Sequence, residues 1–304
     1  MRHAQSGGPP TAAVARRDFV ERGPDQQIDA LFGQRRHQVL LYTLGLYQPR
    51  FGIELHAVTV LSNHIHLVLT DVRGVLPDFF QRVNGMIARA LNVFRGRRDS
   101  FWEGKPYGRV ELLDDGTVID KRVYVAANPV AAGLVDHGEK RPGIRLLPGA
   151  SGRRVIHARK PEFFFSDDDR LPDGVAVVIE RPKTDDDLDH GEFAAQLDEA
   201  IKYREKELRG IAADDGRSFR GVNRVKEQDP FARPTTEEAI GGVNPLFASR
   251  NKERLEQAKA EQAEWDDNYA DALVGYLRRD PDVVFPSGTW WMRVFHKVRC
   301  EAPP

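Results

Sequence analysis

The stretch LSNHIHLVLT, residues 61–70, decides the fold expected for this chain. It is a short apolar run that carries two histidines, His64 and His66, one residue apart. Because side chains alternate across a β-strand, the two imidazoles point to one face, and the aliphatic residues beside them point to the other. The stretch therefore predicts a strand with one apolar face toward a core and a pair of imidazoles on its other face. Such a pair can bind a metal, bind a phosphate, or be two ordinary strand histidines.

The residues on both sides of this strand predict a mixed fold. GIELHAVTVL, residues 52–61, is typical of a strand that forms a β-hairpin with the histidine strand. An amphipathic helix is expected over Leu76–Phe94, where apolar residues recur at helical spacing. The other expected elements are a helix at about 34–48 that stops at Pro49, a strand at 109–113, and a helix containing residues 123–135, capped by Asp120 and interrupted at Pro129.

The character of the chain changes past residue 140, which predicts two parts. Residues 1–140 are expected to form one domain, in which residues 1–27 are disordered or degenerate and residues 11–20 are a weak strand candidate. Residues 141–304 are expected to form a mixed, mainly helical C-terminal extension. Its expected elements are a strand at 175–182, charged helices at about 187–209 and 250–278, and an aromatic strand or hairpin at 283–300.

Composition limits the class of protein. The chain has 304 residues, of which 40% are hydrophobic and 30% charged, as in soluble globular proteins. Its apolar runs are shorter than the roughly 20 residues of a membrane helix, and its first ten residues lack the apolar core of a signal peptide. Cys300 is the single cysteine, which excludes an intrachain disulfide and a cysteine-based zinc site. A cytoplasmic protein without membrane contact is therefore expected.

Charge is unevenly distributed along the chain. The first 150 residues hold 20 basic and 15 acidic side chains, a net charge of +5, and the remaining residues have a net charge of −6. The half with the histidine pair is the basic half, which is compatible with a nucleic-acid partner.

A second motif follows about 60 residues after the histidines. Tyr124 and Asn128 are four residues apart, so on a helix they share one face. A tyrosine hydroxyl, an amide oxygen and two imidazoles can converge on one divalent metal and one phosphate. The alternative is that the Tyr124 ring packs in the core and that Asn128, which precedes Pro129, marks a helix stop.

Together, LSNHIHLVLT and YVAANPVAAGLV, residues 124–135, resemble the HUH single-tyrosine transposases. The likeness is to the REP-associated branch, in which the second motif reads approximately Tyr-x-x-x-Asn-Pro-x-x-Ala-x-Leu-Val. Residues 100–113, SFWEGKPYGRVELL, lie between the motifs and also resemble the family. FPSGTWWMRVF, residues 285–295, is a looser likeness to its long proteobacterial form.

The resemblance implies an α+β fold, with a ferredoxin-like antiparallel sheet, its helices, and the tyrosine helix beside the histidine strand. It implies Mg or Mn as cofactor and single-stranded or hairpin DNA as partner. His64, His66 and Asn128 match the metal-binding positions, and Tyr124 matches the nucleophile. The expected activity is that of a transposase, a single-stranded DNA endonuclease and strand transferase that works through a 5′-phosphotyrosine. Because a free tyrosine has a pKa near 10, a metal that polarises the phosphate compensates for a weak nucleophile.

Basic residues near the motifs are candidates for DNA contacts. Arg82 and Arg89 lie seven residues apart on the expected helix and share a face, and the run after it extends that surface with Arg95, Arg97 and Arg98. The alternative is an ordinary solvated helix face.

Two other functions remain open at this stage. A decayed or domesticated relative would keep hairpin DNA binding without cleavage, and the weak first strand is compatible with that. A metal-dependent phosphodiesterase on small substrates would need a general base to activate water, and no carboxylate stands close to the histidines in sequence. The sequence leaves the DNA target and the oligomeric state undetermined.

Overall fold

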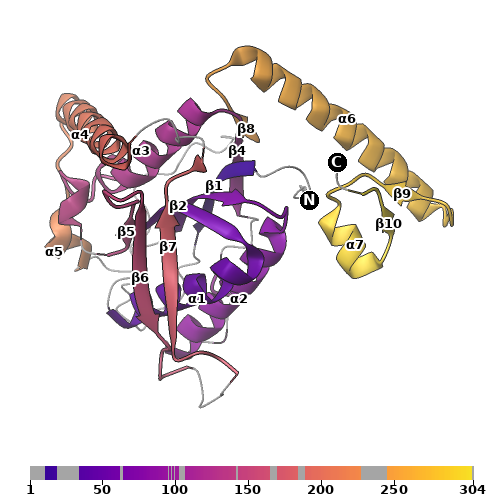
Figure 1. Cartoon of the computed structure of the whole chain (residues 1–304), viewed down its shortest axis with the longest axis horizontal. Coiled ribbons are helices and arrows are strands. Elements are labelled where there is room, and N and C mark those ends of the chain that lie inside the picture. Colours follow the sequence, from indigo (N-terminus) through magenta and orange to yellow (C-terminus); the bar gives the residue numbers. More distant parts are fainter. Residues whose placement is uncertain are drawn as a thin grey trace.

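The computed structural model describes residues 11–18, 34–61, 64–94, 96, 98, 100–102, 107–141, 143–164, 170–183, 189–226 and 245–302. It confirms a mixed α+β fold, drawn in Figure 1, in which helices lie on both faces of one sheet. Among the described helices, none is long and apolar enough to cross a membrane.

The first part of the chain has the element order β-α-β-β-α-β. These elements are β1 (Thr11–Asp18), α1 (Gln34–Phe51), β2 (Ile53–Val60), β3 (His64–Asp71), α2 (Leu76–Phe94) and β4 (Gly108–Leu112). The strands lie in the order β2-β3-β1-β4, and all three neighbouring pairs are antiparallel. This is the topology of the ferredoxin-like fold. The weak strand candidate is thus β1, and it completes the sheet beside the histidine strand.

Strands from the second part of the chain extend the same sheet. They are β5 (Arg145–Leu146), β6 (Arg153–Arg159), β7 (Gly174–Glu180) and β8 (Phe247–Ala248). β7 pairs with β2 in parallel, and β6 pairs with β7 at that edge of the sheet. At the other edge, β8 pairs with β4 in parallel. The full path is β6-β7-β2-β3-β1-β4-β8, with β5 pairing β2. Whether residues 1–140 form a domain that is separate from the rest depends on whether the two parts unfold independently. The boundary near residue 140 therefore stays a prediction.

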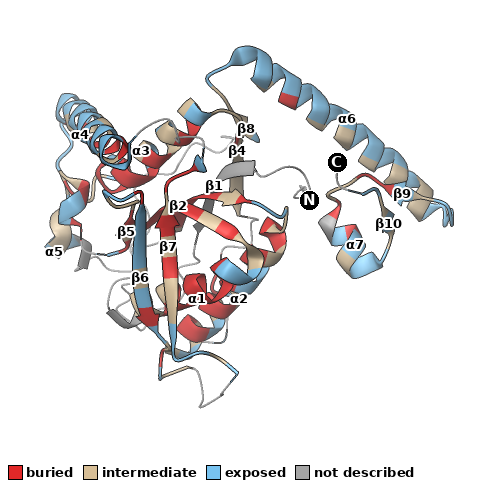
Figure 2. Cartoon of the chain, in the orientation of Figure 1, coloured by how far each residue is buried: buried red, intermediate tan, exposed pale blue. Residues whose placement is uncertain are grey.

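The two faces of the sheet bury different sets of side chains. Leu67 of β3 packs in the larger core with α1 and α2. Val68, the next residue, packs on the opposite face against Val118 and Val125. Both of these belong to α3 (Asp115–Ala131), which crosses the sheet on the side away from α1 and α2. Figure 2 shows the buried residues concentrated in these layers. By alternation, His64 and His66 lie on the α3 face.

The remaining elements follow α3 along the chain. Some pack on α3, and others lie beyond the sheet. These elements are a 3₁₀ turn η1 (Gly138–Lys140), α4 (His190–Asp214), α5 (Gly221–Lys226), α6 (Lys252–Leu277), β9 (Val284–Phe285), α7 (Trp290–His296) and β10 (Arg299–Cys300). α4 packs on α3, whereas α6 leads away from the sheet and buries Ala258 alone (Figures 1 and 2). The expected terminal strand or hairpin is wrong, because α7 separates β9 from β10 and lets them pair in parallel.

Both proline-based helix stops are also wrong. Pro49 and Pro129 lie inside the last turns of α1 and α3, which end at Phe51 and Ala131. Each helix buries residues beside its proline, such as Tyr47 and Val130. Packing of these neighbours outweighs the loss of one backbone hydrogen bond.

A buried histidine joins the two parts of the sheet. His56, at a bulge in β2, is completely buried. Its Nδ1 lies 2.8 Å from the Glu180 carbonyl oxygen of β7, which can only accept, so Nδ1 carries the proton. Nε2 lies 2.8 Å from Thr70 Oγ1 and accepts from that hydroxyl. Burial lowers the pKa of His56 to about 4.

We expect His56 to make the protein less stable in mild acid. Between the ordinary histidine pKa of 6.5 and about 4, the unfolded chain binds a proton at residue 56 that the folded chain does not. The free energy of unfolding should therefore fall as the pH falls through this window, by about 3 kcal/mol in total. Urea denaturation at a series of pH values measures it. A His56→Gln variant should lose this component, and parallel profiles for the two proteins would contradict the assignment.

Candidate active site

The two histidines of β3 lie side by side on the α3 face of the sheet. Their ring centroids are 4.7 Å apart and the ring planes are nearly perpendicular, at 87°. His64 is partly exposed, whereas His66 is only 2% exposed. His66 is buried because it lies in the middle of the sheet, and of the pair only His64 is partly open to solvent.

The ring that lies against His66 is that of Tyr124. The two ring centroids are 5.7 Å apart, with an interplanar angle of 83°. Tyr124 remains 42% exposed, so a substrate can reach it from solvent. Lys121 lies one turn earlier on α3, with its Nζ 5.6 Å from the centre of the Tyr124 ring. The structure thus brings the two sequence motifs together, and it places a cation next to the candidate nucleophile.

Asn128 follows Tyr124 by one turn of α3 and is almost fully buried, at 6% exposure. Its side-chain oxygen Oδ1 has no hydrogen-bond partner among the residues that the structure describes. A buried amide oxygen without a partner costs free energy, which a cation or a donor from a ligand would offset. Two imidazole nitrogens and an amide oxygen are a donor set that fits a divalent ion. No group of three or more His, Cys, Asp or Glu side chains suited to a metal occurs in the described ranges.

The start of the tyrosine helix is fixed by Asp114, not by Asp120 as expected. The Asp114 carboxylate accepts a hydrogen bond from Thr117 N at 2.8 Å, which caps α3. It also accepts from Ser249 Oγ and Arg250 N, in the segment before α6. Burial alone would raise the pKa of Asp114, but these hydrogen bonds lower it to about 2. Asp114 therefore stays ionised and holds the start of α3 against a segment far away in sequence.

Asp120 has a different role, one turn further along α3. It is exposed and forms a two-pronged ion pair with Arg250, at 2.8 Å and 2.5 Å. This pair is a second link between α3 and the segment before α6.

The outer side of α3 is covered by α4. Ala126 of α3 packs with Phe193, Leu197 and Ile201 of α4. Burying a side chain of that size contributes roughly 1.5–3 kcal/mol, so the three together fix α4 on α3. Arg122 of α3 is completely buried, and its guanidinium lies over the Phe193 ring at 4.7 Å. These contacts set the position of the helix that carries Tyr124.

Polar contacts tie the far end of α4 to the loop after α3. Glu205 is only 5% exposed and accepts from Gly138 N at 3.1 Å. Arg145 lies 3.7 Å from the same carboxylate and donates to the Ala126 carbonyl at 2.9 Å. The link from α4 to α3 is therefore both apolar and ionic.

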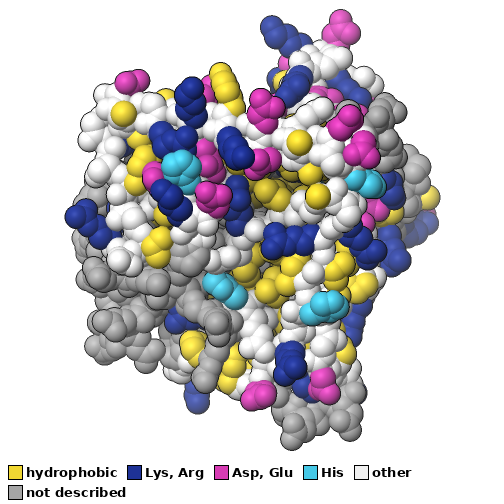
Figure 3. All heavy atoms as spheres, turned by 60° about the vertical axis from the view of Figure 1, so that its left-hand side comes forward, with side chains coloured by type: hydrophobic (Ala, Val, Ile, Leu, Met, Phe, Trp, Pro, Cys, Tyr) yellow, Lys and Arg dark blue, Asp and Glu magenta, His cyan; other side chains and the backbone are white. Residues whose placement is uncertain are grey.

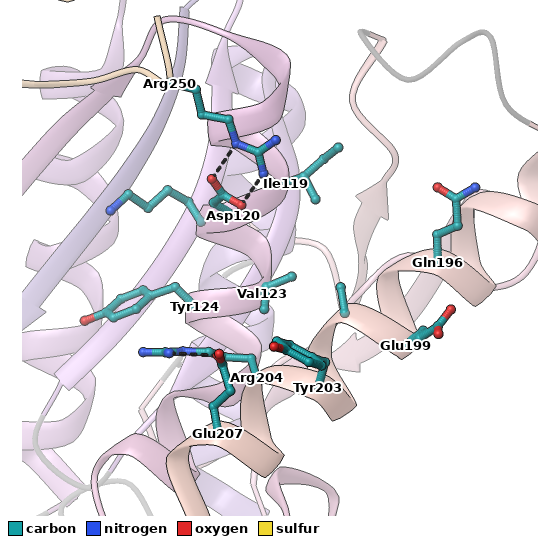
Figure 4. Close-up of a pocket in the computed structure, with 12 residues that line it drawn as sticks. Ile119, Asp120, Val123, Tyr124, Gln196, Glu199, Tyr203, Arg204, Glu207 and Arg250 are labelled. Atoms are coloured by element: carbon teal, nitrogen blue, oxygen red, sulfur yellow. Dashed lines mark hydrogen bonds and ion pairs between the residues drawn. The ribbon is translucent and has the colours of Figure 1, made fainter. Parts of the chain in front are cut away.

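A groove of about 660 Å³ lies between α3 and α4 and opens beside Tyr124. Figure 4 shows the side chains of Tyr203 and Arg204 reaching from α4 toward α3, with Tyr203 near Val123. No sequence motif points to these α4 residues. Their only sequence signal is a tyrosine-arginine pair in a charged helix, which is indistinguishable from an ordinary solvated face.

The predicted DNA-binding arginines lie elsewhere. Arg82 and Arg89 are exposed on α2, in the helical layer on the other side of the sheet from Tyr124. Arg98 is exposed just after α2, and Arg95 and Arg97 fall outside the described residues. The structure therefore does not bring Arg82 and Arg89 to the histidine pair, and the contact of all five arginines with DNA stays a prediction.

Another tyrosine, Tyr107, belongs to the other face of the sheet. Tyr107 packs against the Phe80 ring, with centroids 4.4 Å apart, at the edge of the core formed with α1 and α2. Trp102 is buried there too, and its Nε1 donates to the Asn84 carbonyl at 2.8 Å. Tyr124 is therefore the tyrosine that accompanies the histidine pair.

Two of the solved structures that are similar to this chain are related to transposition. The first is a REP-associated tyrosine transposase bound to a REP hairpin, with 15% sequence identity and a TM-score of 0.37, over 47% of this chain and 78% of that chain. The second is a candidate transposase from Deinococcus radiodurans R1, with 18% identity and a TM-score of 0.25, over 41% of this chain and 95% of that chain. Similarity this low does not show that the chain belongs to their family. No family model and no curated protein matches the sequence.

Proposed function

We propose that this protein is a transposase of the REP-associated tyrosine type, which cleaves and rejoins single-stranded DNA through a covalent 5′-phosphotyrosine at Tyr124. The observation that carries the proposal is the contact between Tyr124 on α3 and His66 on β3, with His64 beside it. Two motifs about 60 residues apart in sequence form one cluster, and its tyrosine is open to solvent. A structural role alone would not require the phenol to be exposed.

His64, His66 and Asn128 are the residues that would hold a divalent metal, Mg or Mn. When bound, that ion would polarise the non-bridging oxygens of the scissile phosphate and help to hold it for attack. The imidazoles bind in their neutral form, so they leave the charge of the ion intact for the phosphate. The buried position of His66, held by its strand and by the Tyr124 ring, makes the donor pair rigid before substrate arrives.

The chain's own residues account for the covalent step. The phenol oxygen of Tyr124 attacks the phosphorus and loses its proton to solvent, to which the side chain is open. The bond from phosphorus to the 3′ oxygen breaks, and that oxygen leaves as a 3′-OH after it takes up a proton. The 5′ phosphate stays on Tyr124 as an ester, so a second 3′-OH can attack it and restore a phosphodiester without ATP. Lys121, next to the ring, is placed to attract the phosphate.

The test is incubation of the full chain with single-stranded hairpin DNA and Mn²⁺, followed by a denaturing gel. We expect a band that contains both protein and DNA, resists denaturation and is absent when a chelator is present. A matched double-stranded blunt duplex without a hairpin serves as control and should give no such band. Tight hairpin binding without any covalent band would favour the alternative, a DNA-binding protein that has lost cleavage.

A further inference from the structure

The groove between α3 and α4 has the dimensions of a ligand site and is adjacent to the candidate nucleophile. Its volume of about 660 Å³ lies within the range of roughly 300–1,000 Å³ that is usual for small-ligand pockets. Tyr124 lines it together with residues of α4. A strand whose phosphate is at Tyr124 could therefore place a neighbouring nucleotide in this groove.

The charge of the groove argues against a track for the phosphate backbone. Its lining contains three cationic side chains (Lys121, Arg204 and Arg250) and three carboxylates (Asp120, Glu199 and Glu207). Two of the cations are paired, Arg250 with Asp120 and Arg204 with Glu207 at 3.1 Å. Figure 3 shows the side of the molecule that lies on the left in Figure 1, where α4 is. Basic and acidic side chains are interspersed on this face. Backbone binding requires an excess of cations, whereas an unpaired nucleobase is itself neutral.

The wall of the groove offers what a base requires. Tyr203 is 65% exposed, so the face of its ring is available for stacking. Val123 and Ala200 supply apolar surface, and the side chains of Gln196 and Glu199 are exposed donors and acceptors for a base edge. In Figure 4, Tyr203 extends from α4 toward the part of α3 that carries Val123, the residue before Tyr124.

We propose that the groove between α3 and α4 binds one unpaired nucleobase of the DNA strand, next to the phosphate attacked by Tyr124, and that this base stacks on Tyr203. The inference rests on the proposed function and adds a substrate subsite to it. In this arrangement Lys121 is near the phosphate, and the base binds against the wall formed by Tyr203, Val123 and Ala200. α4, which comes from the second part of the chain, would thus contribute directly to substrate recognition.

The test separates base binding from cleavage. The full chain is titrated, with a chelator present to prevent cleavage, with labelled oligothymidylate and with an abasic oligomer of equal length and charge. We expect wild-type protein to bind the oligothymidylate about tenfold more tightly, the effect of roughly one stacked base. Tyr203→Ala should make the two dissociation constants nearly equal, mainly because the variant binds the oligothymidylate more weakly. Tyr203→Phe, which keeps the ring, should restore the preference.

Ile211→Ala is the matched control, because Ile211 is an exposed apolar residue of α4 that does not line the groove. It should keep the wild-type preference. The proposal is overturned if wild-type protein binds the two oligomers equally or binds neither, or if Tyr203→Ala keeps the preference. Since no covalent step is involved, these results are independent of whether Tyr124 forms an adduct with Mn²⁺ present.

Discussion

Tyr124→Phe should abolish the covalent protein–DNA adduct, a loss of roughly 10³-fold or more in its rate of formation, because the attacking oxygen is gone. The ring stays, so its contact with His66 stays as well. Since the side chain is 42% exposed, the free energy of unfolding should change by about 0.5 kcal/mol or less. The measurements are a denaturing gel for the adduct, an anisotropy titration for hairpin binding, and urea denaturation for stability.

Tyr107→Phe is the matched control for this variant. Its hydroxyl lies on the other side of the sheet, so the adduct should form at the wild-type rate. Peptide mapping of the wild-type adduct should find the DNA on residue 124. An adduct that survives Tyr124→Phe, or one that maps to Tyr107, would show that the nucleophile is assigned wrongly.

Removal of either histidine of the pair should have the next largest effect. His64→Ala and His66→Asn each remove one imidazole donor, and the rate of adduct formation at limiting Mn²⁺ should fall by about 10²-fold or more. Calorimetric titration with Mn²⁺, without DNA, should show weaker binding for both variants. Hairpin binding in the presence of a chelator should remain, because neither imidazole is then needed.

The two substitutions should differ in their effect on stability. His64 is partly exposed, so His64→Ala should change the free energy of unfolding by about 1 kcal/mol or less. His66 is 2% exposed, so its replacement should cost roughly 1–3 kcal/mol, and Asn is chosen to keep a polar side chain there. His157→Ala is the control, since His157 is exposed on β6. Unchanged Mn²⁺ affinity in both variants of the pair would exclude them as ligands.

The sequence predicted those features that depend on local pattern. Alternation in β3 predicted which face carries the histidines, and helical spacing predicted α2 with the same bounds as the structure, Leu76–Phe94. Spacing also placed Tyr124 and Asn128 on one helix. Each of these follows from the geometry of a single strand or helix, which is the same in every fold.

What the sequence could not predict depends on contacts between distant segments. The ring of Tyr124 lies against His66, and the cap of α3 is Asp114, whose carboxylate also accepts a hydrogen bond from Ser249. Asp120, the expected cap, is instead held by Arg250. The groove beside Tyr124 exists because α4 returns to pack on α3. No local pattern contains these pairings, since each joins residues far apart in the chain.

The dependence of α3 on later segments has a consequence for the order of synthesis. β3 and Tyr124 leave the ribosome before α4, which supplies Phe193 and Ile201, and well before Ser249, which binds the cap. A growing chain therefore exposes both motifs while the helix with the nucleophile still lacks the partners that orient it. If the site cuts DNA as proposed, it becomes competent only after the chain has emerged as far as Ser249. A chain that ends before α4 would then carry both motifs and show no cleavage, because α3 would lack the contacts from Phe193 and Ser249.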